Sequence, residues 1–264
     1  MQQHSTAVIH KATRIGEDVT VGAYAVIEDG VQIGEGTVIR EHAILRSGTI
    51  LGSNCHVDAH VVLGGLPQDL SFNPKTPTGV RVGNCVTFRE GVTINRSTVE
   101  ESFTEVGDHA FFMANSHAGH DCRIGDHAIL ANGVLLAGRV SVGQQTFIGG
   151  NAGIHQFCRI GESVMIGGMA RVSQDVPPFC MVAERNALIG LNLVGLKRRG
   201  LERETIRELK RLYRVVFEFE GRPRVLAAGA LGDQLAESPE GRSFLEFISA
   251  ESKKGVMRPR GEAD

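Results

Sequence analysis

The chain of 264 residues is long enough for one large domain with a smaller appendage. Its formal net charge of −2 offers no broad basic surface, so no nucleic acid is expected as a partner. No apolar run reaches the ~18 residues of a membrane span, and the N-terminus has no basic and then apolar leader, so we expect a cytoplasmic protein without a transmembrane segment.

A six-residue repeat dominates the chain up to about residue 172. Aliphatic side chains recur at every sixth position over residues 9–63, 82–94 and 106–172. This spacing fits neither a helix nor long strand alternation, whereas short strands joined by identical turns into a prism explain it. Three hexads make a coil of 18 residues, and neighbouring coils lie at roughly 4.8 Å. The repeat predicts a mainly β protein, with a parallel β-helix over residues 1–184.

Two segments interrupt the repeat, at residues 65–80 and 96–105, and predict loops that leave the prism. Insertions in a solenoid commonly serve a binding face. The five cysteines form no CxxC pair, and one of them occupies a repeat position where a small inward side chain is wanted. We therefore expect free thiols rather than a disulfide framework.

The C-terminal part, residues 185–264, is predicted to be a helical domain. Helical periodicity covers residues 202–219 and 225–236. Ser238, followed by Pro239, has the signature of an N-cap and opens a third predicted helix. The tail after Lys254 is expected to be disordered.

The segment 115–122 is the one place where two histidines and a carboxylate fall inside the repeat. His120 is a candidate general base, because imidazole exchanges protons near neutral pH, and Asp121 is positioned to fix its tautomer. Since residues 18 apart stack, Gly138 is expected one coil beyond His120, and Gln156 one coil beyond Gly138. A base, an unscreened backbone N–H and an amide are the parts needed for acyl transfer.

Five segments resemble the acyl-carrier-protein-dependent UDP-N-acetylglucosamine O-acyltransferases, the family that begins lipid A biosynthesis. They are residues 115–122, 136–140, 154–158, 174–178 and 190–200. The resemblance runs through the whole chain. It implies a left-handed parallel β-helix of hexapeptide repeats and a homotrimer with its active sites between neighbouring prisms. It also implies transfer of a 3-hydroxyacyl group from acyl carrier protein to the 3-position of UDP-N-acetylglucosamine or its 3-amino analogue.

The same resemblance implies a role for individual residues. His120 corresponds to the general base, Asp121 to the residue that orients it, and Gly138 to the donor of the oxyanion N–H. The residues implied in binding substrate or donor are Gln68, Asp69, His117, Arg139, His155, Gln156, Asn192, Arg198 and Arg199. Gly168 matches the position that limits acyl-chain length, and its missing side chain predicts a donor toward the long end of the range. No metal is implied, and no cofactor besides the phosphopantetheine of acyl carrier protein.

Four positions depart from the usual family residues. Ser71 replaces a lysine, Asn95 a histidine, Arg139 a histidine and Val194 an acidic residue. All four bear on how the nucleotide sugar is held. Some members that lack the lysine use an acceptor with an amine, so the choice between the two acceptors stays open.

Other functions remain possible on such a prism. A γ-class carbonic anhydrase gathers three histidines around zinc, and His117, His120 and His155 are the candidates here, although 35 residues separate the last two. A non-enzymatic scaffold would not need the stacked column of base, glycine and amide. The related N-acyltransferase of the same pathway carries an additional N-terminal domain, whereas the hexads here begin at Ile9.

Overall fold

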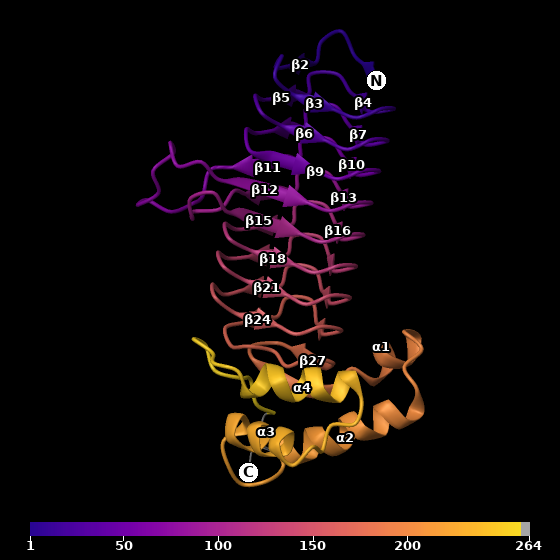
Figure 1. Cartoon of the computed structure of the whole chain (residues 1–264), viewed down its shortest axis with the longest axis vertical. Coiled ribbons are helices and arrows are strands. Elements are labelled where there is room, and N and C mark those ends of the chain that lie inside the picture. Colours follow the sequence, from indigo (N-terminus) through magenta and orange to yellow (C-terminus); the bar gives the residue numbers. More distant parts are fainter. Residues whose placement is uncertain (260–264) are drawn as a thin grey trace.

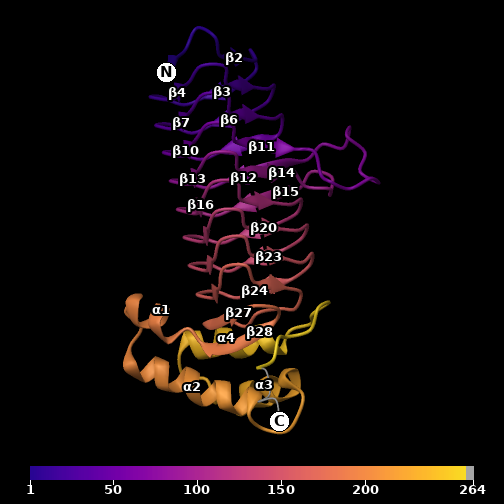
Figure 2. The ribbon, with the colours of Figure 1, turned by 180° about the vertical axis from the view of Figure 1, so that it is seen from behind.

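The computed structural model describes residues 1–259, which form a triangular prism of stacked coils with helices packed against one end (Figures 1 and 2). Each side of the prism is one sheet. Face A consists of β1 (Gln2–Gln3), β4 (Thr20–Val21), β7 (Val38–Ile39), β10 (His56–Val57), β13 (Thr87–Phe88), β16 (Phe111–Phe112), β19 (Ile129–Leu130), β22 (Phe147–Ile148), β25 (Met165–Ile166), β27 (Cys180–Ala183) and β28 (Ala187–Leu191).

The other two sides are built in the same way. Face B consists of β2 (Val8–Ile9), β5 (Val26–Ile27), β8 (Ile44–Leu45), β11 (Val62–Gly65), β14 (Thr93–Asn95), β17 (His117–Ala118), β20 (Leu135–Leu136), β23 (Gly153–Ile154) and β26 (Arg171–Val172). Face C consists of β3 (Arg14–Ile15), β6 (Gln32–Ile33), β9 (Thr49–Leu51), β12 (Gly79–Val82), β15 (Phe103–Val106), β18 (Arg123–Ile124), β21 (Ser141–Val142) and β24 (Arg159–Ile160).

The repeat aliphatics form the core, as predicted. Each strand from β2 to β26 contains one of them, and from Val21 onward all are buried. Neighbouring coils pair in parallel, so that Phe112 lies beside Leu130 and Leu130 beside Ile148. Residues 18 apart therefore stack at the corners as well as on the faces.

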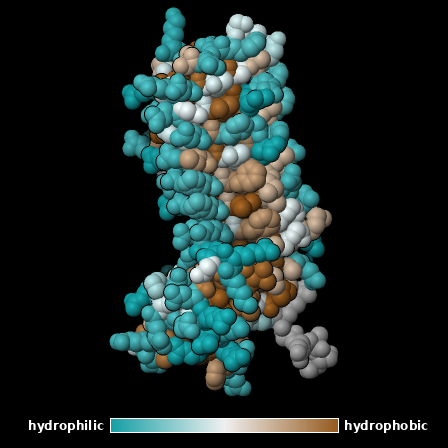
Figure 3. Space-filling view, turned by 90° about the vertical axis from the view of Figure 1, so that its right-hand side faces the viewer, coloured by the Kyte–Doolittle hydropathy of each residue, from teal (hydrophilic) through white to brown (hydrophobic). Residues whose placement is uncertain are grey.

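The outward side chains differ between the faces. On face A they include Phe111, Ile129, Phe147 and Met165, each half-buried. On face C the corresponding positions carry charged or polar residues, such as Arg123 in β18. In Figure 3, hydrophobic side chains gather in a band along the prism. Face A is thus apolar on its outward side over these four coils.

Both predicted loops leave the prism on one side, shown at the left of Figure 1. Strands β12 and β15 reach into the predicted segments and pair with one another from Gly79 and Phe103 onward. The first loop therefore spans residues 66–78, and the second spans residues 96–102.

Face A ends in an antiparallel hairpin of β27 and β28, which leads into the C-terminal part and which sequence periodicity did not indicate. The predicted helices correspond to α2 (Arg203–Phe217), α3 (Pro223–Gly232) and α4 (Pro239–Ser249). Ser238 caps α4 as predicted, since its side chain accepts a hydrogen bond from the Gly241 amide at 2.9 Å. The six-residue helix α1 (Leu193–Arg198) was too short to be recognised from its periodicity. Within residues 1–259, no helix is both long and apolar enough to cross a membrane.

The expectation of a disordered tail after Lys254 is wrong for residues 255–259. Asp175 donates its amide hydrogen to Gly255 and accepts that of Met257, at 2.9 and 2.8 Å. Met257 is fully buried, and Pro259 forms a bridge to Leu188. The buried side chain of Met257 fills a gap between the prism and the helices and holds this segment in place. We call residues 252–259 the C-terminal strap. The rest of the predicted tail, residues 260–264, lies outside the described residues.

Candidate active site

A pocket opens on face B, around the corner where this face meets face C. Its lining includes many of the residues singled out in the sequence, namely Gln68, His117, His120, Gly138, His155 and Gln156. They come from three successive coils and the first loop. The stacking of coils brings them together, because positions 120, 138 and 156 occupy the same corner one above another.

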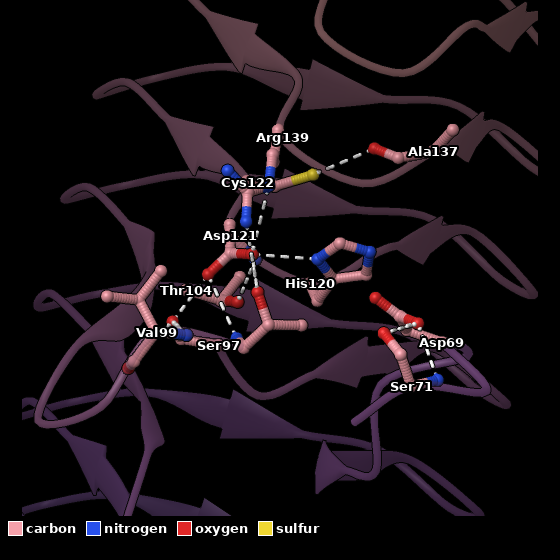
Figure 4. Close-up of polar contacts among 11 residues, drawn as sticks. Asp69, Ser71, Ser97, Val99, Thr104, His120, Asp121, Cys122, Ala137 and Arg139 are labelled. Carbon is pink, nitrogen blue, oxygen red and sulfur yellow. Dashed lines mark hydrogen bonds and ion pairs between the residues drawn. The ribbon is translucent and has the colours of Figure 1, made fainter. Parts of the chain in front are cut away.

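His120 and Asp121 form a hydrogen-bonded pair on this corner (Figure 4). The His120 Nδ1 lies 2.7 Å from the Asp121 Oδ2. Asp121 has a φ of 59°, a left-handed conformation that aspartate tolerates better than most residues. An ionised carboxylate accepts but cannot donate, so the Nδ1 of His120 must carry a hydrogen. The neutral ring is then left with a free lone pair on Nε2, which lies at the pocket.

The second loop surrounds the Asp121 carboxylate with donors. Ser97 Oγ donates to Oδ1, the Thr98 amide donates to Oδ1 at 3.0 Å, and Thr98 Oγ1 donates to Oδ2 at 2.6 Å. Burial raises the pKa of Asp121, but the hydrogen bonds from Ser97, Thr98 and His120 outweigh it and hold the pKa at about 2. Sequence reasoning missed Ser97 and Thr98, because nothing in a polar loop marks which residues fold back onto a carboxylate.

Gly138 lies directly against His120. A Cβ built at Gly138 would be 2.4 Å from His120 Nε2 and 2.6 Å from Cε1, so only glycine leaves room for the ring. Among the hydrogen bonds within residues 1–259, none uses the Gly138 amide hydrogen. The stacking predicted for these two positions is confirmed, with a free backbone donor beside the free nitrogen of the imidazole.

His117 is a neighbouring polar group of the pocket. Its Nδ1 lies 2.7 Å from Thr93 Oγ1 on the preceding coil. Burial lowers the pKa of His117, while the contact with Thr93 acts in the opposite direction. Near neutral pH this ring is therefore an uncharged hydrogen-bonding group.

The first loop brings Asp69 to the open side of the pair, next to His120 in Figure 4. Ser71 donates to Asp69 Oδ1 from its amide at 2.9 Å and from its hydroxyl at 2.7 Å. These bonds lower the pKa of Asp69, and the positive charges of His120 and Arg139 add to the effect. Ser71, one of the four departures from the family pattern, therefore acts on the carboxylate of Asp69.

Asn95, a second departure, ties face B to the first loop. Its Nδ2 donates to the Leu66 carbonyl at 2.9 Å. Its Oδ1 is buried and has no hydrogen-bond partner among the described residues, although Asn95 lines the pocket. This oxygen is available to a donor group of a ligand.

Arg139 contacts the Asp121 carboxylate and the second loop, while its side chain remains 45% exposed. Its Nε lies 3.6 Å from Asp121 Oδ2, and its Nη2 lies 3.3 Å from Thr98 Oγ1. Its guanidinium is also 5.8 Å from the centre of the Phe157 ring. The positive charge of Arg139 therefore favours the ionised form of the Asp121 carboxylate.

Four predicted residues lie elsewhere on this chain. Asn192 caps α1 by accepting from the Gly195 amide at 3.1 Å, and Arg198 and Arg199 follow at the end of that helix. Burial lowers the pKa of Arg199. Figure 1 shows α1 on the side of the prism opposite the two loops. Gly168 lies at the corner of faces A and B, where a Cβ would be 3.3 Å from the Gly150 carbonyl oxygen.

The three histidines considered as zinc ligands do not form a cluster. His120 Nδ1 is occupied by Asp121, and His117 Nδ1 contacts Thr93. Among residues 1–259, no group of three or more His, Cys, Asp or Glu side chains is arranged to hold a metal ion.

The chain is similar in sequence to known acyltransferases. A family model described as domain 2 of UDP-N-acetylglucosamine O-acyltransferase matches residues 175–257, and hexapeptide-repeat models match residues 12–47, 42–64 and 103–138. An acyl-[acyl-carrier-protein]–UDP-N-acetylglucosamine O-acyltransferase from Anaeromyxobacter dehalogenans is 44% identical over 98% of this chain and 100% of the relative. One from Campylobacter concisus is 42% identical over 81% of this chain and 82% of the relative.

A solved structure extends the agreement to the fold. The UDP-N-acetylglucosamine acyltransferase from Campylobacter jejuni superimposes with a TM-score of 0.91 at 36% identity, over 98% of this chain and all of the other. The prism is therefore the expected left-handed β-helix, and the protein is an acyltransferase built from hexapeptide repeats. Within that class, the chain belongs to the UDP-N-acetylglucosamine O-acyltransferase family. The metalloenzyme alternative is not favoured.

Proposed function

We propose that this protein transfers a 3-hydroxyacyl group from acyl carrier protein to the 3-position of UDP-N-acetylglucosamine, or of its 3-amino analogue, as the first step of lipid A biosynthesis. The observation that carries the proposal is the free Nε2 of His120 next to the free amide hydrogen of Gly138. The names of the relatives supply the donor and the nucleotide sugar.

In this mechanism His120 Nε2 removes the proton from the attacking hydroxyl or amine of the acceptor. The acceptor atom bonds to the thioester carbonyl carbon, and the Gly138 N–H donates to the oxyanion that forms. Collapse of this intermediate breaks the carbon–sulfur bond, and the imidazolium returns its proton to the leaving thiolate of phosphopantetheine. The Asp121 carboxylate, ionised at any physiological pH, stabilises the imidazolium between the two steps.

Residues around the His120–Asp121 pair determine which acceptor is bound. Asn95 offers its unpartnered Oδ1, which either a hydroxyl or an amine could satisfy as a donor. Ser71 donates two hydrogen bonds to the carboxylate of Asp69. These contacts leave the base and the oxyanion donor unchanged, so we expect both acceptors to use the same mechanism.

We further propose a homotrimer in which neighbouring prisms share the active sites. The apolar outward side chains of face A need a partner surface, since large exposed apolar patches mark interaction sites. Asn192, Arg198 and Arg199 lie on the opposite side from the loops, so a neighbouring chain is needed to bring them to the pocket. Light scattering should give three times the chain mass; a monomer at micromolar concentration would contradict this arrangement.

The reaction is proposed to take place in the cytoplasm. All five cysteines are free thiols, and four of them are buried, which fits a reducing compartment. The donor is proposed to carry a long acyl chain, because Gly168 presents no side chain to a groove between prisms.

The decisive experiment is to incubate the protein with 3-hydroxyacyl carrier protein of several chain lengths and with each of the two sugar nucleotides. Mass spectrometry should reveal a product heavier by one acyl group, and His120→Ala should remove it. The proposal fails if neither nucleotide is acylated by any donor under conditions in which a related enzyme, such as the one from Campylobacter concisus, is active.

A further inference from the structure

The C-terminal strap places a lysine beside the pocket. Lys254 Nζ lies 3.1 Å from Nδ1 of His155, which lines the pocket. Ser252 Oγ accepts the amide hydrogens of Lys254 and Gly255, at 3.0 and 2.8 Å, and Met257 is buried further along the strap. Backbone and packing contacts on both sides therefore fix where Lys254 lies.

The chemistry of this contact decides the tautomer of His155. A lysine ammonium has three donors and no acceptor, so Nδ1 of His155 must accept and carries no hydrogen. The other partner within reach of Nδ1 is the Gln156 carbonyl at 3.3 Å, which would require a hydrogen on Nδ1. The two contacts exclude one another, and the shorter one has a charged donor, which makes it the stronger. The hydrogen of the neutral ring is then on Nε2.

We propose that Lys254 is a positioning residue of this enzyme, which holds His155 in the tautomer that donates from Nε2 to a phosphate oxygen of a bound substrate. The inference rests on the proposed function for the identity of that substrate. Arg171 also lines the pocket, on the strand that pairs with the one just before His155, and its positive charge favours an anion in this part of the pocket. Both proposed substrates carry phosphate, one as the diphosphate of the nucleotide sugar and one in the phosphopantetheine arm of the donor.

Lys253 provides a matched control on the same strap. Its ammonium lies 4.9 Å from the centre of the Phe157 ring, and within residues 1–259 it makes no hydrogen bond to His155. Lys253→Met and Lys254→Met each remove one positive charge, at adjacent positions, and keep a side chain of similar length. A difference between the two variants therefore reports the contact with His155 and not the net charge of the strap.

The first test needs no substrate. In protein labelled with ¹⁵N-histidine, the His155 signals can be assigned by comparison with His155→Gln. At a pH at which the ring is neutral, they should show a hydrogen on Nε2 and none on Nδ1. Lys254→Met should move the hydrogen to Nδ1, where it can bond to the Gln156 carbonyl, while Lys253→Met and Lys254→Arg should resemble wild type. A hydrogen on Nδ1 in wild type, or an unchanged tautomer in Lys254→Met, would overturn the inference whatever the protein catalyses.

The second test is kinetic. Lys254→Met should raise the KM of one substrate about tenfold, the effect of losing a hydrogen bond to a charged group, with kcat within threefold of wild type. Lys254→Arg should restore the KM, and Lys253→Met should leave both constants unchanged. A higher KM for the sugar nucleotide assigns its diphosphate to His155, and a higher KM for the carrier protein assigns the pantetheine phosphate. If neither KM rises although the tautomer has changed, the role in binding is refuted; if wild type acylates neither nucleotide, it is the proposed function that fails.

Discussion

The close approach of Gly138 to His120 predicts the effect of one added methyl group. In Gly138→Ala the new Cβ would be 2.4 Å from His120 Nε2, whereas ordinary contacts of a Cβ begin at 3.4 Å. The ring therefore has to move by about 1 Å, and the 2.7 Å hydrogen bond to Asp121 opposes the movement. A misplacement of that size costs about 100-fold in rate, or about 2.7 kcal/mol of barrier.

This substitution separates ring position from the other functions of the glycine. The φ of Gly138 lies outside the left-handed region, so alanine fits the backbone, and the amide donor proposed for the oxyanion is retained. We expect kcat to fall about 100-fold, with the thermal unfolding midpoint within a few degrees of wild type. Gly229→Ala is the control: its Cβ would meet nothing within 4 Å, and in helix α3 it should stabilise by up to about 1 kcal/mol with no change in kcat.

Steady-state kinetics with a saturating carrier-protein donor, together with thermal unfolding of the same preparations, provide the assay. If kcat of Gly138→Ala stays within threefold of wild type while the protein remains folded, the placement of the His120 ring is not what limits the reaction, and the reasoning is refuted. A large fall in the unfolding midpoint would instead show that the methyl group displaces the coil and not only the ring.

The remaining predictions concern the base, its carboxylate and the acyl groove. His120→Ala should lower kcat by about 10²–10⁴-fold without changing the unfolding midpoint, and kinetics within a few-fold of wild type would remove His120 from the mechanism. Asp121→Asn should cost less than His120→Ala, because the ring stays in place. Since folding lowers the pKa of Asp121 from 3.8 to about 2, its contribution to stability is complete above about pH 4 and is lost as the pH falls toward 2; chemical unfolding of wild type and Asp121→Asn should therefore differ at pH 6 and converge near pH 2. Gly168→Met should abolish activity on long acyl donors and retain it on short ones, and an unchanged chain-length profile would place the limit elsewhere.

The fold was predictable because a prism imposes the same demand at every coil. Each coil must supply three inward apolar side chains at fixed spacing. A wrong assignment at one position therefore does not change the assignment of the other positions. The same spacing predicts that Gly138 lies next to His120, since positions 18 apart share a corner. The hairpin of β27 and β28 and the short helix α1 follow no repeat, and they were missed.

The parts of the site that escaped prediction all depend on contacts between distant segments. Ser97 and Thr98 hold the Asp121 carboxylate from 24 and 23 residues away, on a loop whose composition does not show which way its side chains point. Residues 255–259 of the strap were wrongly expected to be disordered, because their few apolar residues form no periodic pattern. The buried Met257 side chain and the backbone hydrogen bonds to Asp175 together place Lys254 next to His155, 99 residues earlier in the chain.

A division between scaffold and chemistry follows from this arrangement. Inward positions of the hexad must stay small or apolar, because each is buried between the corresponding positions of the neighbouring coils. Polar chemistry is therefore restricted to corners and outward positions, which the core does not constrain. His120 and Gly138 use one corner of the stack for the step common to the family, whereas Ser71 and Asn95 act from a loop and an adjoining strand end. Substitutions at these last two positions can change how an acceptor is held while the base, its carboxylate and the oxyanion donor remain where the repeat places them.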